Sequence, residues 1–478
     1  MMKFNAKISM LVFVLAASFG CGNDIGKIKI NQTSNPVVSN PNTNSPDTGT
    51  TQPITGSPAE EYTAGPIIYR SNNGNDFLFS VSDVEGPKAG YYPDEARFGT
   101  LAVGAGGTTP LFRCLSNGTN RTHFLSTATN CEGHTNEGSL GNVSTTAKSG
   151  LVPLVRWVHL KSSLHIAVVP SEKIDFTGWK QEGTLGYVTE IRIPSVVKTP
   201  DDGKKYFGYY AGAMDGVGSG DYISELWTSS NLIFIKSAGN FEAKLADCER
   251  RGVKAVITFD YLFLDNDFRL KSDYKEKFKT VEPIIQKYSA TIAAFYGLDE
   301  PYANSAAHGV SAAETYHAQE TMGRFLKSKF PTIPIGVIFT TNEVKTGNRL
   351  FPSFDWFGFD CYNAEMECGG QSVSWYFNKL STMMNEATVK DGKKRYLMAI
   401  PQSGHPVSDG SKTGEKNILA QIPGYRQIVR SNSNIKVVMP FLWQTFNDGS
   451  ANWIGTREIP NVKAQYLMFY QDFMRGTL

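Results

Sequence analysis

The spacing of apolar residues changes near residue 200, and the second part of the chain alternates apolar runs with amphipathic segments. In segments such as NFEAKLADCERRG, apolar positions recur at helical spacing. The apolar runs are KKYFGYYAGA, NLIFIKS, KAVITFDYLFLD, IAAFYGLDEP, IPIGVIFTT, DWFGFDCYN, RYLMAIPQSG and IKVVMPFLWQTF. Eight strands with helices between them predict an α/β TIM (β/α)8 barrel over residues 204–478, with a shortened fifth connection at NEVKTGNRLFPS.

Residues 63–190 repeat one pattern three times. The segments IIYR, PLFR and PLVR end at Arg70, Arg113 and Arg156, which are 43 residues apart. Each is followed by a second apolar stretch and then by a glycine turn. Short strands with regular turns in three copies predict a closed, three-fold all-β domain of β-trefoil-like type. The chain is therefore expected to be multidomain, with this domain ahead of the barrel.

The second copy, RTHFLSTATNCEG, resembles a repeat of unknown function that has a His-Phe-Tyr-Thr core and a Glu-Gly turn. That repeat is often appended to secreted microbial hydrolases, and the resemblance covers residues 63–190. The first and third copies depart from the histidine motif, which favours a structural role for His123. Sugar binding by this domain and a plain spacer or packing role both stay open.

The first 62 residues carry features of export. Lys3 and Lys7 precede an apolar stretch too short to cross a bilayer, which predicts a signal peptide over residues 1–21. Its end, ASFGC, resembles a bacterial lipoprotein cleavage box and implies lipidation of Cys21; plain secretion is the alternative. Residues 22–62 are rich in Pro, Ser, Thr and Asn, which predicts a disordered linker. The protein is expected to be exported and either lipid-anchored to the cell envelope, at the outer membrane or cell surface, or secreted.

The charge balance and the cysteine positions limit which ligands, bonds and partners the chain is expected to have. The 47 basic and 45 acidic side chains leave a formal charge of +2 without a long basic run, so nucleic acid is not an expected partner. Export makes Cys114 with Cys131 and Cys361 with Cys368 candidate disulfides, and leaves Cys248 as a buried helical thiol. Neither a C-x-x-C unit nor a histidine pair at ligand spacing is present, so no metal and no cofactor is predicted, although an acidic calcium site stays open. A monomer that touches the membrane only through its lipid is expected.

Acidic residues end several of the predicted strands. Asp260 ends the third, Asp299 and Glu300 end the fourth, and Asp360 ends the sixth. Because the carboxyl ends of barrel strands meet at the rim that carries the active site, these acids are site candidates rather than packing errors. Strand alternation predicts that Glu300 shares a face with Tyr296 and points into the barrel mouth, while Asp299 faces the other way.

Two carboxyl groups that flank a bond are what glycoside hydrolysis requires. Crowded, partly buried acids would raise the pKa of Glu300, so that it could hold a proton near neutral pH. The catalytic candidates are Glu300, Asp360 and Asp260. The substrate-binding candidates are Asp299, Tyr362, Asn363, Gln402, Trp443, Gln444 and, in the first loop, Asp215. Trp443 is expected to offer a flat face to a sugar ring.

The segment GLDEP resembles the fourth-strand motif of the large clan of cellulase-like glycoside hydrolases. The resemblance implies the barrel fold, a glycan substrate and Glu300 as the acid. In that clan Asn usually precedes this glutamate, and a nucleophilic glutamate ends strand seven; here Asp299 precedes it and the seventh run ends with Gln402. The clan's double displacement is therefore not carried over, and Asp360 or Asp260 is expected to supply the second carboxylate. The alternative is a non-catalytic carbohydrate-binding surface lipoprotein, an adhesin on a degenerate barrel.

Overall fold

The computed structural model describes residues 63–104, 106–118, 121–172, 174–191, 203–213, 222–237, 239–447 and 452–478. The predicted signal peptide, the lipidation site Cys21, the linker and Asp215 lie outside the described residues. Within the described ranges, no helix has both the length and the apolar character that a bilayer crossing needs.

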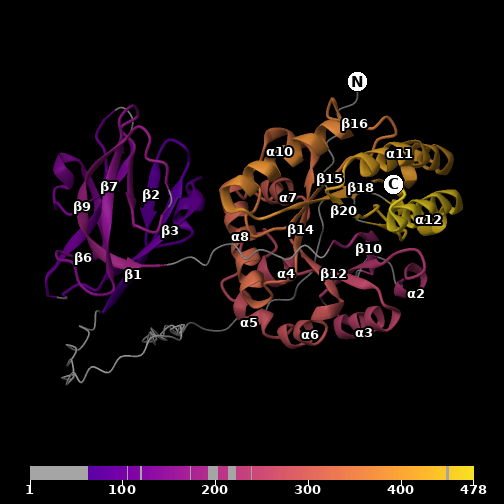
Figure 1. Ribbon diagram of the computed structural model, residues 1–478, viewed down its shortest axis with the longest axis horizontal. Helices are drawn as coiled ribbons and strands as arrows, with labels where there is room; N and C mark the ends of the chain where they lie inside the picture. The colour runs from indigo at the N-terminus through magenta and orange to yellow at the C-terminus, as the bar shows by residue number, and fades with distance from the viewer. Residues whose placement is uncertain are drawn as a thin grey trace, which may run out of the picture. The chain divides into compact units, whose positions relative to one another are not determined.

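The N-terminal domain is a nine-stranded antiparallel unit in which each sequence repeat supplies three strands (Figure 1). The strands are β1 (Ala64–Asn72), β2 (Phe77–Ser80), β3 (Tyr92–Leu101), β4 (Thr108–Leu115), β5 (His123–Ser126), β6 (Thr135–Ser144), β7 (Leu151–His159), β8 (His165–Val168) and β9 (Trp179–Glu190). Within each repeat the first strand pairs with the other two, and β3, β6 and β9 pair with one another. The three repeats thus share one plan of strand pairing, with a short helix α1 (Glu85–Lys88) in the first copy, and the trefoil assignment stays a prediction.

The repeated arginine links each copy to its neighbour. Its guanidinium donates to a backbone carbonyl in the second strand of the preceding copy, where the third copy precedes the first. The same guanidinium forms an ion pair with a glutamate of that copy. The carbonyl contacts are Arg70 to Ala167, Arg113 to Phe79 and Arg156 to Leu125, each 2.9 Å. The ion pairs are Arg70–Glu172 at 2.7 Å, Arg113–Glu85 at 2.9 Å and Arg156–Glu132 at 2.7 Å. The 43-residue period of the sequence therefore reflects a contact made three times around the domain.

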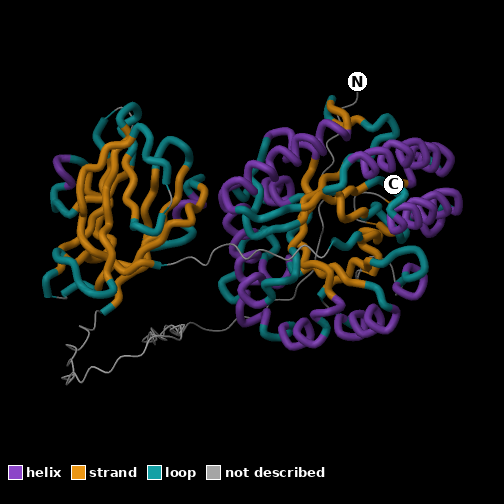
Figure 2. The backbone as a smooth tube through the Cα atoms, in the orientation of Figure 1, coloured by secondary structure: helices purple, strands orange, loops and turns teal. Residues whose placement is uncertain are grey.

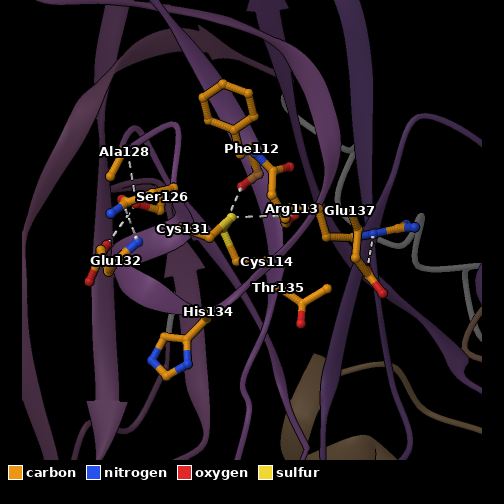
Figure 3. Close-up of a disulfide and its surroundings, with 12 residues drawn as sticks. Phe112, Arg113, Cys114, Ser126, Ala128, Cys131, Glu132, His134, Thr135 and Glu137 are labelled. Atoms are coloured by element: carbon orange, nitrogen blue, oxygen red, sulfur yellow. Dashed lines mark hydrogen bonds and ion pairs between the residues drawn. A yellow bond between two sulfur atoms is a disulfide. The ribbon is translucent and has the colours of Figure 1, made fainter.

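Both predicted disulfides are present. Cys114 near the end of β4 is bonded to Cys131 in a short 3-10 turn, Cys131–Gly133 (Figure 3). Both cysteines are fully buried and cluster with Phe124. In the barrel Cys361 is bonded to Cys368. Cys248 lies outside both disulfides and is buried in helix α3 (Phe241–Arg251), as predicted.

Replacing Cys114 and Cys131 together by serine is expected to destabilise the N-terminal domain by about 3 kcal/mol, because the bond closes a loop of 17 residues. The matching change at Cys361 and Cys368, which closes a loop of 7, is expected to lose only about 2 kcal/mol. Denaturant unfolding of each variant beside the parent chain measures both effects. A larger loss for the shorter loop would contradict the loop-entropy account.

Eight parallel strands between Tyr206 and Val438 form a closed barrel, in the order β10, β11, β12, β13, β14, β15, β18, β20. The strands are β10 (Tyr206–Ala213), β11 (Leu232–Lys236), β12 (Lys254–Thr258), β13 (Ile292–Tyr296), β14 (Ile335–Thr340), β15 (Trp356–Asp360), β18 (Tyr396–Ile400) and β20 (Ile435–Val438). Each of the apolar runs found in the sequence contains one of them. The predicted TIM barrel is confirmed.

Helices surround the strands of the barrel, as the colouring of Figure 2 shows. Besides α3 they are α2 (Ile223–Leu226), α4 (Asp260–Phe263), α5 (Tyr274–Phe278), α6 (Glu282–Lys287), α7 (Pro301–Ala307), α8 (Ala312–Lys329), α9 (Thr341–Thr346), α10 (Val373–Asp391), α11 (Ser411–Ser431) and α12 (Pro460–Arg475). The fifth connection holds only the six-residue α9, which agrees with the shortened segment predicted there.

Apolar side chains form two layers in the barrel. One layer fills the bore and includes Phe234, Tyr296 and Met398. The other lies between the strands and the helices and includes Phe295 and Trp443. Successive strand residues point alternately to the bore and to the helices. Because both of these layers are apolar, each strand appears in the sequence as a continuous apolar run.

A buried carboxylate sits where β15 begins. Asp355 is 2% exposed and contacts the ammonium groups of Lys327 at 2.9 Å and Lys393 at 3.1 Å. It also accepts the backbone N–H of Ile335 at 2.8 Å. Because each partner comes from a different part of the chain, this group fastens α8, β14 and the segment before β18 to one another at the amino ends of the strands.

Candidate active site

A strained turn brings two acids to the carboxyl end of β13. The strand ends at Tyr296, and a side chain at Gly297 would lie 2.8 Å from both Gln319 and Phe354, so the backbone can pass there only as glycine. Glu300 has a φ of 43°, in the left-handed region, and caps α7, whose first residue is Pro301. Non-glycine residues rarely take this conformation, and they concentrate at functional sites. The sequence therefore fixes the position of Glu300 through backbone shape.

Asp299 lies on the bore side, so the predicted opposite orientation is wrong. Tyr296, a bore residue, donates its phenol hydrogen to Asp299 Oδ1 at 2.6 Å. Tyr210 of β10 makes a second hydrogen bond to the same carboxyl group. Leu298, which strand alternation would place in the bore, packs in the outer layer instead. Alternation fails here because the chain leaves the strand after Tyr296.

Glu300 and Asp360 lie at the barrel mouth and interact through charge and a hydrogen bond between their carboxyl groups. Both side chains are half-buried. Burial, and then the charge of Asp360, raise the pKa of Glu300 to about 9. Burial raises the pKa of Asp360 to about 7, with the charge of Asp299 adding to the effect and the hydrogen bond from Glu300 opposing it. Burial and the charge of Asp360 thus both favour the protonated form of Glu300, compared with an ordinary glutamate.

Two further acids act on this group. Asp260 begins α4, accepts the hydroxyl hydrogen of Thr258 at 2.7 Å, and helps to raise the pKa of Asp299, for which burial and Glu300 are the larger causes, to about 7. Glu343 is buried and accepts the backbone N–H groups of Ala303 and Thr340, each at 2.7 Å. Burial raises the pKa of Glu343 to about 8. Glu343 was not predicted as a site residue, although the segment TTNE shows a helix-capping pattern.

Aromatic side chains gather beside the acids. Tyr362, which follows β15, stacks on Phe441 with ring centres 5.3 Å apart. Trp453 meets Phe441 edge-on at 5.2 Å, and Tyr210 lies 5.6 Å from the same ring. All four rings are half-buried, so they can offer apolar surface to a ligand. Of these, only Tyr362 was predicted; Trp453 lies in the short strand β22 (Asn452–Ile454), and Phe441, in the eighth apolar run, forms an isolated β-bridge with Gln402.

Three predicted binding residues are placed elsewhere. Trp443 is fully buried in the outer layer, 4.9 Å from the ring of Tyr209, so the expected sugar-stacking role is wrong. Gln444 is also fully buried. Gln402 is buried and accepts a hydrogen bond at 3.1 Å from Gln421 of α11, which directs it to the helix layer. Burial of these side chains contradicts their predicted contact with a substrate.

The predicted substrate-binding role of Asn363 stays a prediction. It is half-buried after β15, and its side chain accepts the backbone N–H of Glu365 at 2.9 Å. Among the described residues, no group of three or more His, Cys, Asp or Glu side chains is arranged to hold a metal ion.

Replacing Asp360 by asparagine is expected to stabilise the protein by on the order of 1 kcal/mol at pH 8. A carboxyl group whose folded-state pKa is raised favours folding at low pH, and this contribution is lost as pH rises from about 4 through the folded value of about 7. The advantage of the variant should therefore grow between pH 4 and 7 and stay level above it. Thermal unfolding over this range measures the difference, and a variant that is less stable at pH 8 would contradict the expectation.

Comparisons with known proteins return structures only. Neither the protein-family models nor the curated proteins include a match to this chain. Among solved structures, xylanase 10B from Thermotoga petrophila RKU-1 with xylobiose is similar at 10% identity and a TM-score of 0.38, covering 59% of this chain and 99% of its own. A GH113 β-1,4-mannanase is similar at 13% identity and 0.35, covering 55% and 98%. The GH26 endo-β-1,4-mannanase of Bacillus sp. JAMB-750 is similar at 11% and 0.35, covering 57% and 88%. Likeness at this level assigns no activity to the chain.

Proposed function

We propose that this protein is a glycoside hydrolase that cleaves O-glycosyl bonds of a poly- or oligosaccharide, with Glu300 as the acid. The observation that carries the proposal is the hydrogen-bonded pair of Glu300 and Asp360 at the carboxyl ends of the barrel strands. A carboxylic acid that stays protonated near neutral pH, in a half-buried position, is what departure of a sugar oxygen needs.

In the proposed reaction the glycosidic oxygen approaches Glu300, which transfers its proton as the bond to the anomeric carbon lengthens. The positive charge that develops on the sugar ring is stabilised by the carboxylates of Asp299 and Asp360. The rings of Tyr362, Phe441 and Trp453 supply apolar surface for the substrate. Asp260 is placed to tune the charge of Asp299.

The remaining parts of the proposal concern the location of the protein and the role of its N-terminal domain. We place the protein outside the cytoplasm as a monomer, attached through lipidated Cys21 and the linker of residues 22–62. The N-terminal domain is proposed to have the β-trefoil fold and to serve the barrel as a binding or spacing module. The lipid is the only membrane contact proposed.

The test is release of reducing ends by the purified full chain from a panel of glycans. The panel contains β-linked glucan, mannan and xylan, α-glucan, chitin and peptidoglycan. Turnover of at least one glycan supports the proposal. Absence of turnover on every glycan, at pH values from 5 to 8, contradicts it.

A carbohydrate-binding surface protein is the second candidate. It is favoured by one observation: the strand-seven segment carries Gln402, turned toward α11, and no acid follows it in that loop before Asp409. A glycan array separates the two candidates. Retention of a sugar by a chain that cleaves none of the panel would establish the binding function in place of the hydrolase.

A further inference from the structure

The acids of the mouth leave the nucleophile of the reaction unassigned. Glycosidases with two catalytic carboxyls hold them about 5 to 5.5 Å apart in retaining enzymes and about 6.5 to 9.5 Å apart in inverting ones. Glu300 and Asp360 instead act on each other's pKa through a hydrogen bond between their carboxyl groups, so they are a proton-sharing pair rather than an acid and a separate nucleophile. Strand seven ends in Ile400 and is followed by Pro401 and the buried Gln402, so it offers no acid.

Asp299 is held in a way that suits a different task. Two phenol groups, from Tyr296 at 2.6 Å and from Tyr210, hydrogen-bond to its carboxyl group. Oxygens engaged by two O–H donors are poor nucleophiles, but they fix the direction in which the remaining lone pairs point. The group is adjacent in sequence to the proposed acid and shares its half-buried environment. Asp299 is thus suited to accept a hydrogen bond from an N–H group that gains positive charge.

We infer that the substrate supplies its own nucleophile and carries a 2-acetamido group, so that this site cleaves 1,2-trans-linked 2-acetamido-2-deoxy sugars. The inference rests on the proposed function and deepens it. The half-buried ring of Tyr210, which packs edge-on against the buried ring of Tyr296 with centres 6.1 Å apart, would offer the acetamido methyl an apolar face next to the carboxyl that would hold its N–H.

The reaction balances without another reagent. The acetamido oxygen bonds to the anomeric carbon as the glycosidic C–O bond breaks, and the proton of Glu300 passes to the departing oxygen. Asp299 accepts a hydrogen bond from the acetamido N–H, which becomes acidic in the cyclic intermediate. Water then bonds to the anomeric carbon, Glu300 takes its proton back from that water, and the ring opens to restore the acetamido group. Two displacements at one carbon retain its configuration.

The first test compares tetra-N-acetylchitotetraose with cellotetraose, which differ at the 2-position. The full chain is expected to cleave the former with a kcat/KM about 100-fold higher or more. The first product should be the β-anomer, as followed by proton NMR. Faster cleavage of cellotetraose, or a first product of inverted configuration, would overturn the inference while leaving the proposed hydrolase standing. Cleavage of neither oligosaccharide, together with inactivity on the wider glycan panel, would overturn both.

The second test asks whether the acetamido oxygen takes part. In a series of aryl glycosides whose N-acetyl group carries zero, one, two or three fluorines, kcat/KM should fall steadily as the oxygen becomes less nucleophilic. Asp299→Asn should lower kcat on the unfluorinated member by about 100-fold with little change in KM. The matched Asp265→Asn change, on an exposed loop, should not alter either constant. Rates that are insensitive to fluorine would overturn the inference, since a merely structural role of Asp299 does not produce that dependence.

Discussion

Replacement of Glu300 by glutamine is expected to lower kcat on an unactivated glycan by about 10²- to 10⁴-fold, the usual contribution of a positioned acid. Glutamine keeps the shape of the side chain and can still hydrogen-bond to Asp360, so glycan affinity should change little. An aryl glycoside with a strongly acidic phenol needs no proton on departure. On that substrate the variant should recover most of the parent rate, which separates loss of acid catalysis from loss of structure.

The same variant should change the pH dependence of turnover. Glu300 acts in its protonated form, and its pKa is raised by burial and by Asp360, so activity of the parent chain should fall on the alkaline side as this proton is lost. The glutamine variant should lack that alkaline decline in its residual activity. Glu249→Gln, an exposed change on α3, serves as the matched control. If Glu300→Gln retains full activity on an unactivated glycan, Glu300 is not the acid.

Replacement of Asp355 by alanine is expected to destabilise the protein by about 3 to 5 kcal/mol. The change leaves the buried ammonium groups of Lys327 and Lys393 without the carboxylate that they share. It also leaves the backbone N–H of Ile335 without its acceptor. The comparable Asp273→Ala change removes an exposed pair with Lys277 and should lose less than about 1 kcal/mol.

The effect of Asp355 should depend on pH with a definite sign. Although burial raises its pKa, the two lysines and the N–H of Ile335 outweigh burial and hold the pKa below the ordinary value of 3.8. Its stabilising contribution is therefore complete above that value and declines as pH falls through the lower folded-state pKa. Denaturant unfolding at pH 7 measures the full difference between the variants. Equal losses for Asp355→Ala and Asp273→Ala would show that the buried group does not hold the barrel together.

Periodicity was sufficient to predict the barrel, because each strand is apolar on both faces and each amphipathic segment has one apolar side. The arginine period likewise revealed the three-fold domain, since the same interaction recurs in each copy. Pairing of Cys114 with Cys131 followed from export and short spacing. These features are properties of local sequence, and the structure reproduces them.

The composition of the site was harder to predict because it depends on where each strand stops. Trp443 and Gln402 follow apolar runs as Glu300 does, yet both are buried against the outer helices. Asp299 reached the bore because the chain departs from strand geometry after Tyr296. Phe441, which follows β20 and bridges to Gln402, is brought beside Tyr362 only by closure of the barrel. No periodic pattern carries that information.

The arginine contacts of the N-terminal domain form a closed circuit, because Arg70 in the first copy reaches Ala167 in the third. Cutting the gene after any one copy would break the circuit twice, so the three units should fold together or not at all. A rearranged gene that starts at the second copy and joins the old ends would keep every contact. Each copy therefore makes the same contact with its neighbour, and no copy is structurally the first. This equivalence is what duplication of one short ancestral unit would produce.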